Sequence, residues 1–199
     1  ILADEMGLGK TLQMLGVINA REVSSNLIVV PLALLDQWNQ AVRNILGCAP
    51  LVYHGNLKKR IDVNTLSVAP IVITTYGEIS MLKGKLRDIH RVKWQRVCFD
   101  EAHHLRNPKT GMHKGALALQ VPIRWLMTGT PIQNSKRDFY SLCAVMGLEA
   151  SYYTKEHNLM ELVRTYIIKR TKKDAGLVLP SLVTQQESLM WDSKDEANL

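Results

Sequence analysis

Apolar residues in this chain fall into short continuous runs, separated by stretches in which they recur at helical spacing. The runs are typical of strands buried on both faces of a parallel sheet. They occupy residues 1–3, 27–30, 51–53, 71–74, 96–99 and 124–127. Residues 12–23 and 34–46 have the spacing of amphipathic helices. Strands that alternate with helices predict an α/β fold, a parallel sheet with helices on both faces.

The alternation stops near residue 135, and the apolar positions in 139–146 and 159–167 predict two further helices. We therefore expect an α/β unit over residues 1–134, followed by a helical extension over residues 135–199. The first strand candidate has no lead-in, because Ile1 already lies inside it. This start predicts that the chain is a piece of a longer protein.

Charge adds a candidate partner to this picture. The formal net charge is +7, with 46% hydrophobic and 22% charged residues. The composition is that of a globular protein, and the positive charge favours an anionic partner, nucleic acid first, over an ordinary basic protein without one. Cys48, Cys98 and Cys143 lie far apart without metal-ligand spacing, which favours a reducing compartment over a disulfide framework.

A glycine-containing loop between the first strand and the first helix has the layout of a phosphate-binding loop. It consists of Asp4, Glu5, Met6, Gly7, Leu8, Gly9, Lys10 and Thr11. Loop N–H groups and the following helix N-terminus favour phosphate, and Lys10 would reach the β- and γ-phosphates while Thr11 ligates Mg²⁺. Asp4 stands where the generic pattern has its first glycine. A Gly-Lys-Thr tripeptide by itself is often only a loop entering a helix, and that interpretation stays open at this point.

Polar motifs also follow two later strands. Asp100-Glu101-Ala102-His103 comes directly after the 96–99 run, and Thr128-Gly129-Thr130 comes after the 124–127 run. In a phosphate-loop enzyme, the first carboxylate holds Mg²⁺ and the second deprotonates the attacking water; the alternative is an acidic pair that opens a turn. Ligands bind at the carboxyl ends of parallel strands, so we expect these motifs to meet at one edge of the sheet.

Together residues 4–11, 100–103 and 126–134 resemble motifs I, II and III of the Swi/Snf-type ATPases of helicase superfamily two, a family that includes viral global transactivator proteins. The family's motif I carries Asp where the generic loop has glycine, as Asp4 does here. Pro31 and Gln37 lie in a stretch similar to motif Ia, and residues 73–76 resemble motif Ib. Residues 168–174 resemble the stretch between the family's two motor lobes. RNA helicases with a DEAH box are similar to this chain in motif II, but they would carry Ser-Ala-Thr as motif III, where this chain has Thr128-Gly129-Thr130.

The resemblance implies the first of two RecA-like lobes that clamp Mg-ATP and move along double-stranded DNA, in the nucleus or a host nucleus. Chromatin or transcription proteins are further expected partners. The implied catalytic residues are Lys10, Asp100 and Glu101, and the implied Mg²⁺ ligands are Thr11 and Asp100. The residues implied to couple nucleotide state to DNA binding are His103, Thr128, Gly129 and Thr130. The implied contacts to the DNA backbone are Pro31, Gln37, Thr74, Thr75 and Tyr76.

The alternative is a module that binds DNA or a protein without hydrolysing ATP. Intact Lys10, Asp100 and Glu101 argue against it. The family's arginine fingers belong to the second lobe, so we expect these 199 residues alone to be nearly inactive. His103 could instead only cap the turn after motif II. We interpret Trp38 as a core residue and His104 as a solvated neighbour without a role.

Overall fold

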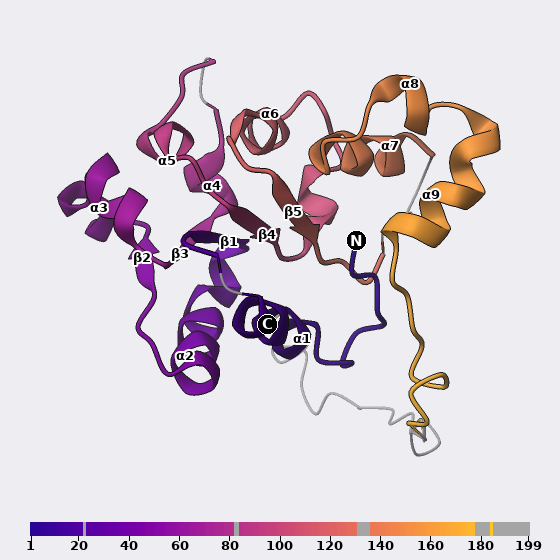
Figure 1. Ribbon diagram of the computed structural model, residues 1–199, viewed down its shortest axis with the longest axis horizontal. Helices are drawn as coiled ribbons and strands as arrows, with labels where there is room; N and C mark the ends of the chain where they lie inside the picture. Colours follow the sequence, from indigo (N-terminus) through magenta and orange to yellow (C-terminus); the bar gives the residue numbers. More distant parts are fainter. Residues whose placement is uncertain (22, 82–83, 131–135, 178–183, 185–199) are drawn as a thin grey trace, which may run out of the picture.

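The computed structural model describes residues 1–21, 23–81, 84–130, 136–177 and 184. A sheet of five parallel strands forms its centre, in the order β2-β3-β1-β4-β5 (Figure 1). The strands are β1 (Asn26–Val30), β2 (Leu51–Tyr53), β3 (Ile71–Thr75), β4 (Arg96–Phe99) and β5 (Ile123–Leu126). The predicted parallel α/β fold is confirmed, and each of these strands begins within one residue of its apolar run.

Helices connect the strands, and several short ones went unpredicted because four to eight residues carry too little periodicity. The α-helices are α1 (Lys10–Ala20), α2 (Leu35–Leu46), α3 (Val63–Val68), α4 (Tyr76–Ile79), α5 (Asp88–Arg91), α6 (Gly111–Ala118), α7 (Lys136–Val145), α8 (Ala150–Tyr153) and α9 (Leu159–Tyr166). The 3₁₀ turns are η1 (Leu32–Leu34), η2 (Leu57–Arg60), η3 (Ala102–Leu105) and η4 (Glu156–Asn158). No α-helix in the described part of the chain has the length and apolarity needed to cross a bilayer.

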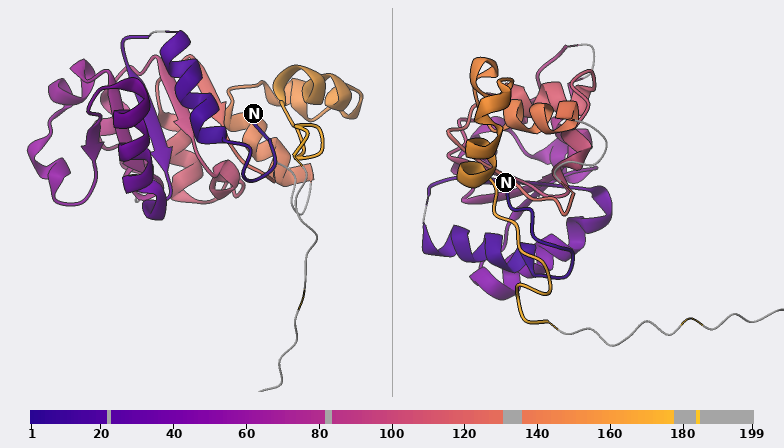
Figure 2. Two further views of the ribbon diagram at one scale, coloured as in Figure 1. Left: turned by 90° about the horizontal axis from the view of Figure 1, so that it is seen from below. Right: turned by 90° about the vertical axis from the view of Figure 1, so that its right-hand side faces the viewer.

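Each face of the sheet has its own hydrophobic core. Along β1, Leu27 and Val29 belong to one core, and Ile28 and Val30 belong to the other. Helices α1 and α2 cover the second face, whereas α4 to α7 cover the first (Figures 1 and 2). Because successive side chains of a strand point to opposite faces, a strand that is apolar at every position must be buried on both sides.

Residues 1–3 were expected to form a strand, but they do not form a regular one. Leu2 instead makes isolated parallel bridges to Met127, just beyond β5, and to Ile168, just after α9. The Ala3 N–H donates to the Ile168 carbonyl at 2.7 Å, and the Glu5 N–H donates to Arg170 at 3.0 Å. The chain entering the glycine loop is therefore held between the end of β5 and residues 166–170.

Helix α7 packs into the core of the α/β unit although it belongs to the expected extension. Phe139, Leu142, Cys143 and Val145 are all buried members of the first core. The expected boundary between residues 134 and 135 lies outside the described residues, so the division into two parts stays a prediction.

Candidate nucleotide-binding site

The glycine loop bends tightly before helix α1 begins at Lys10. Gly7 has a φ of 89° and Gly9 a φ of 72°, values that a residue with a Cβ adopts only with strain. The Lys10 ammonium donates to the Asp4 carbonyl at 2.9 Å and lies 3.5 Å from the Glu5 carbonyl. The lysine thus closes the loop on itself and lies with its charge inside the curve, where a phosphate chain would enter.

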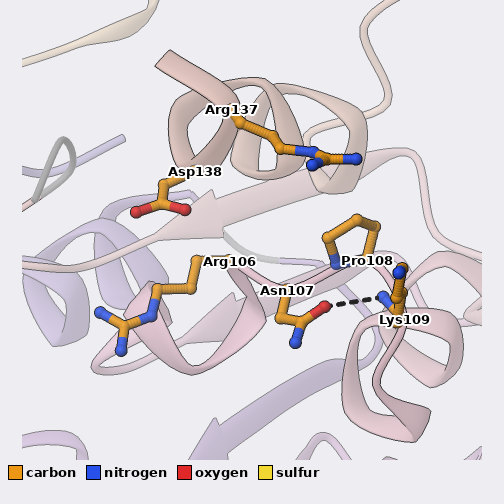
Figure 3. Close-up of a pocket in the computed structure, with 6 residues that line it drawn as sticks. All are labelled: Arg106, Asn107, Pro108, Lys109, Arg137 and Asp138. Atoms are coloured by element: carbon orange, nitrogen blue, oxygen red, sulfur yellow. Dashed lines mark hydrogen bonds between the residues drawn. The ribbon is translucent and has the colours of Figure 1, made fainter. Parts of the chain in front are cut away.

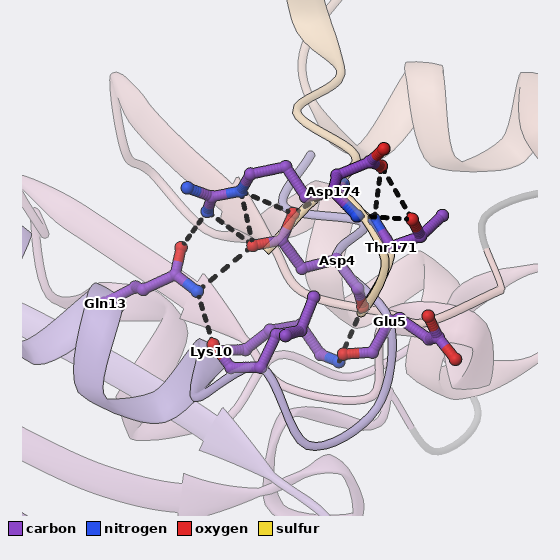
Figure 4. A network of polar contacts seen from close by, with 8 residues as sticks. Asp4, Glu5, Lys10, Gln13, Thr171 and Asp174 are labelled. Atoms are coloured by element: carbon purple, nitrogen blue, oxygen red, sulfur yellow. Dashed lines mark hydrogen bonds and ion pairs between the residues drawn. The ribbon is translucent and has the colours of Figure 1, made fainter. Parts of the chain in front are cut away.

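Asp4, the residue in place of the generic glycine, is a fully buried acceptor (Figure 4). Its carboxylate accepts from the Gln13 side chain at 3.1 Å and from the Arg170 main-chain N–H at 2.9 Å. The Arg170 guanidinium also donates to both carboxylate oxygens. Burial raises the pKa of Asp4, but the hydrogen bonds and charge of Arg170, with Gln13, outweigh burial and hold this pKa below its ordinary value.

Asp100, at the end of β4, is held from both faces of the sheet. The Trp38 indole N–H donates to its Oδ2 atom at 2.7 Å, and the Glu101 N–H donates to Oδ1 at 2.9 Å. From the opposite face, the Tyr76 hydroxyl donates to the Asp100 carbonyl at 2.6 Å. Burial raises the pKa of Asp100, an effect that the Trp38 and Glu101 hydrogen bonds and the Lys10 charge only partly offset.

Glu101 has a left-handed backbone with a φ of 50°, the one such non-glycine residue among those described. This conformation costs free energy and is common where a functional side chain must be aimed. The His103 Nδ1 atom lies 3.1 Å from the Glu101 carboxylate. The Ala102 N–H donates to the Met127 carbonyl at 2.9 Å, so motif II is joined to the start of motif III through the main chain.

Motif III lies against the glycine loop. Thr128 is fully buried, and its N–H donates to the Leu2 carbonyl at 3.1 Å. A Cβ on Gly129 would lie 3.4 Å from Met6 Cγ and 3.9 Å from Lys10 Nζ, both ordinary van der Waals distances, so motif III and the glycine loop are neighbours here. Thr130 donates its N–H to the Thr128 hydroxyl at 3.3 Å. The remaining motif III residues, 131–134, lie outside the described part of the chain.

These elements surround a cleft of about 470 Å³ at the carboxyl edge of the sheet. Its lining comes from the glycine loop, helices α1 and α2, and motif II. The residues are Met6, Gly7, Gly9, Lys10, Thr11, Leu12, Leu34, Gln37, Ile45, Asp100 and Glu101. Lys10 and Asp100, which were predicted to meet at one edge of the sheet together with Thr128, line this cleft, and Thr11 and Glu101 line it too.

The oxygen atoms available in this cleft fit Mg²⁺. This ion favours hard oxygen ligands and is commonly held by one or two carboxylates together with nucleotide phosphates. Asp100, which carries a carboxylate, and Thr11, which carries a hydroxyl, both line the cleft. Among the described residues, no cluster of three or more His, Cys, Asp or Glu side chains is placed to hold a metal.

The expected contacts to DNA are only partly compatible with the structure. Gln37 is exposed and Pro31 is partly exposed. Thr74 and Tyr76 are buried, and their hydroxyls donate to the Tyr53 and Asp100 carbonyls, so direct contact of these side chains with DNA is not supported. Thr75 is buried too, with its hydroxyl 3.3 Å from His54. Motif Ib spans the end of β3 and the first residue of α4, and the backbone there directs these side chains into the protein.

Two basic side chains that are far apart in the sequence, Lys58 and Arg87, meet at one buried carboxylate. Glu78 in α4 accepts from the Lys58 ammonium at 2.7 Å and the Arg87 guanidinium at 2.9 Å. His54 lies 3.6 Å from the same carboxylate. The loop after β2 is thereby fixed to α4 at the edge where the cleft lies.

A second hollow of about 360 Å³ lies between the turn after motif II and the start of α7 (Figure 3). Its lining is Arg106, Asn107, Pro108, Lys109, Arg137 and Asp138. The Asn107 side chain accepts from the Lys109 N–H at 3.0 Å, which shapes the turn. The predominance of cationic side chains makes this hollow a more suitable surface for an anion than for an apolar ligand.

Sequence reasoning missed the partners of the two acidic residues. Trp38 is buried as expected, yet it also donates to Asp100, and Arg170 and Gln13 hold Asp4. Spacing in the sequence gives no signal for a contact between residues 62 or 166 positions apart. His104, expected to be inert, stacks on His103 with ring centroids 4.6 Å apart and also faces Tyr76.

A parallel sheet with a phosphate-type loop, an acidic pair and a threonine motif at one edge is the arrangement of a RecA-like lobe. A family model described as SNF2-related domain matches residues 1–196. The chain therefore belongs to the SNF2-related family.

Solved structures and curated proteins agree with this assignment. The Sulfolobus solfataricus SWI2/SNF2 ATPase core, solved in complex with dsDNA, matches with a TM-score of 0.70 and 27% identity over 88% of this chain and 41% of that one. An uncharacterized ATP-dependent helicase of Schizosaccharomyces pombe is 34% identical over 98% of this chain and 22% of its own length. A probable global transactivator of Orgyia pseudotsugata multicapsid polyhedrosis virus is 29% identical over 98% of this chain and 42% of its own length. The chain thus spans less than half of each relative.

Proposed function

We propose that this chain is the first motor lobe of a DNA-dependent ATPase that hydrolyses ATP to move along double-stranded DNA in the nucleus. Lys10 and the loop N–H groups bind the phosphates, and Thr11 and Asp100 hold Mg²⁺. Glu101 accepts the proton of the attacking water. When bound, the metal ion neutralises charge on the phosphates. His103 orients Glu101, and Thr128, Gly129 and Thr130 link the state of the nucleotide to the grip on DNA.

One observation carries the proposal: Lys10, Thr11, Asp100 and Glu101 line the same cleft. Lys10 and Thr11 begin helix α1, whereas Asp100 and Glu101 lie in the turn after β4, about ninety positions later in the sequence. A buried carboxylate with fixed hydrogen bonds, next to a strained glutamate and a phosphate-type loop, is a specific arrangement for phosphoryl chemistry. The DNA partner rests on the family and on the +7 charge, with contacts to the backbone instead of base edges.

Calorimetric titration of the full chain with ATP and Mg²⁺ tests the nucleotide site. We expect measurable binding that Lys10→Ala abolishes and Glu101→Gln leaves nearly intact, because only the lysine contacts the ground-state phosphates. Binding that survives Lys10→Ala unchanged would place the nucleotide elsewhere.

A phosphate-release assay, with and without duplex DNA, separates the motor lobe from a module that never hydrolyses ATP. Hydrolysis by these 199 residues alone should be near background, because an arginine finger is worth about 10³–10⁵ in turnover. Adding the family's second lobe to the chain should restore DNA-stimulated hydrolysis, and Glu101→Gln should remove it again. Failure of the two-lobed protein to turn over ATP favours the binding module.

A further inference from the structure

Trp38 and Asp100 form a buried hydrogen bond whose role goes beyond core packing. The indole is 1% exposed and the aspartate 6% exposed, and the Nε1–Oδ2 distance is 2.7 Å. Since the Glu101 N–H occupies Oδ1, each carboxylate oxygen already has one donor. A hydrogen bond to a charged acceptor is stronger and more directional than a neutral one.

Two donors at fixed positions determine how the carboxylate is rotated about its Cβ–Cγ bond. The lone pairs left on Oδ1 and Oδ2 therefore point in set directions, and Asp100 lines the cleft. Donors behind a ligating carboxylate act in this way in metal sites, and their removal typically weakens metal binding about 10–100-fold. The Glu101 donor is a main-chain N–H that any residue except proline carries, whereas the Trp38 donor depends on this side chain.

The helix that carries Trp38 also lines the cleft. Gln37, the preceding residue, is exposed and lines the cleft, while Trp38 points inward to Asp100. A ligand or partner that displaces α2 through Gln37 must therefore also displace the donor to Asp100. Because Gln37 and Trp38 are adjacent on one helix, a movement of Gln37 also moves the indole that donates to Asp100.

We propose that Trp38 is a positioning residue, which orients the Asp100 carboxylate for Mg-nucleotide and couples the position of α2 to the metal-binding end of β4. This inference rests on the proposed function, in which Asp100 is a ligand of Mg²⁺. It assigns Trp38 no contact with the reacting atoms.

Trp94 provides a matched control within the same chain. It is also 1% exposed, and its indole N–H donates to the Ile89 carbonyl at 2.9 Å. It stands two positions before the first residue of β4, so it lies at the strand end opposite to Asp100. Replacing either tryptophan by phenylalanine removes one buried indole hydrogen bond and leaves a comparable cavity.

The test measures ADP affinity of the full chain with Mg²⁺ and with EDTA, by calorimetry, in Trp38→Phe and Trp94→Phe. For Trp38→Phe, we expect the gain in ADP affinity from Mg²⁺ to fall about tenfold or more, with metal-free affinity unchanged. Trp94→Phe should keep the full gain even where its thermal stability drops. Equal behaviour of the two variants would overturn the inference.

A second measurement covers the case in which Trp38→Phe does not fold. In protein labelled with ¹⁵N-tryptophan, the indole signals are assigned by single substitutions of the other three tryptophans. The Trp38 indole signal should move when Mg²⁺ is added to the ADP complex, and the Trp94 signal should not. A stationary Trp38 signal contradicts the inference.

Asp100→Asn separates this inference from the proposed function. If Asp100→Asn retains the full effect of Mg²⁺ on ADP affinity, then Asp100 is no metal ligand and the proposed function fails with it. If Asp100→Asn loses that effect while Trp38→Phe keeps it, then only the positioning role of Trp38 is wrong.

Discussion

Arg170 donates to both carboxylate oxygens of Asp4, a residue 166 positions earlier in the chain. Asp4 opens the glycine loop, and Arg170 lies in the stretch that follows α9. The Lys172 N–H reinforces the pairing by donating to the Glu5 carboxylate at 2.8 Å. A movement of the segment after α9 therefore acts directly on the loop that is proposed to bind phosphate.

Removing Arg170 should loosen this loop. In Arg170→Ala the buried Asp4 carboxylate keeps only Gln13 and main-chain donors, and such a carboxylate is costly without its cation. We expect Tm to fall by roughly 3–8 °C and ADP affinity to weaken several-fold. Differential scanning calorimetry and ADP titration measure both effects.

Lys169→Ala is the control for that change, because Lys169 is exposed and also cationic. It should leave both Tm and ADP affinity near the wild-type values. If Arg170→Ala behaves like Lys169→Ala, the contact between Arg170 and Asp4 has no effect on the loop.

Acid should weaken the same contact. The pKa of Asp4 is lower in the folded protein than in the unfolded chain, so Asp4 takes up a proton on unfolding at a pH between the two values. The carboxylate therefore stabilises the fold above its unfolded pKa of about 3.9, and this contribution is lost as pH falls through the lower folded value.

Urea unfolding of wild type and Asp4→Asn measures the free energy of unfolding from pH 6 to pH 3. The difference between the two should be constant above about pH 5 and shrink below about pH 4. A difference that grows in acid contradicts this account.

Five of the six apolar runs became strands of the sheet, because a strand buried on both faces leaves a local pattern, whereas residues 1–3 form only isolated bridges. The edge on which Lys10, Asp100 and Thr128 meet also followed, since parallel strands end together. Contacts such as Tyr76 with Asp100 depend on how the turn after β3 rotates, which no local pattern encodes. Because no pattern in the sequence indicates this rotation, Tyr76 was expected to face DNA, whereas its hydroxyl supports motif II from inside the protein.

Two helical glycines should respond oppositely to the same substitution. A Cβ on Gly115 in α6 would lie 1.7 Å from the Ile79 carbonyl oxygen of α4, whereas a Cβ on Gly16 in α1 would meet nothing within 4 Å. Gly115→Ala should therefore cost about 3 kcal/mol or prevent folding, because backbone must move. Gly16→Ala should be neutral or stabilise by up to about 1 kcal/mol through helix propensity. Chemical denaturation of both variants gives the comparison, and a well-folded Gly115→Ala protein would show that α4 and α6 do not cross this closely.

DNA binding should be weak, independent of sequence and sensitive to salt. A lobe that contacts about three phosphates should lose roughly 40-fold in affinity between 50 and 200 mM salt. Fluorescence anisotropy with two duplexes of unrelated sequence, titrated across a salt series, measures this loss. A strong preference for one duplex, or an affinity that does not change with salt, argues against contacts to the backbone.

Two neighbouring lysines refine the prediction about DNA. Lys58 and Lys59 both lie in η2, which follows β2 at the carboxyl edge of the sheet. Lys58 is paired with buried Glu78 at 2.7 Å, whereas Lys59 is exposed. Because Lys58 is already neutralised by a protein carboxylate, Lys58→Ala should lower stability and leave the salt slope of DNA binding unchanged. Lys59→Ala should leave stability unchanged and reduce the magnitude of that slope by about one. The reverse result, a slope that depends on Lys58 and not on Lys59, would mean that DNA replaces Glu78 as the partner of Lys58.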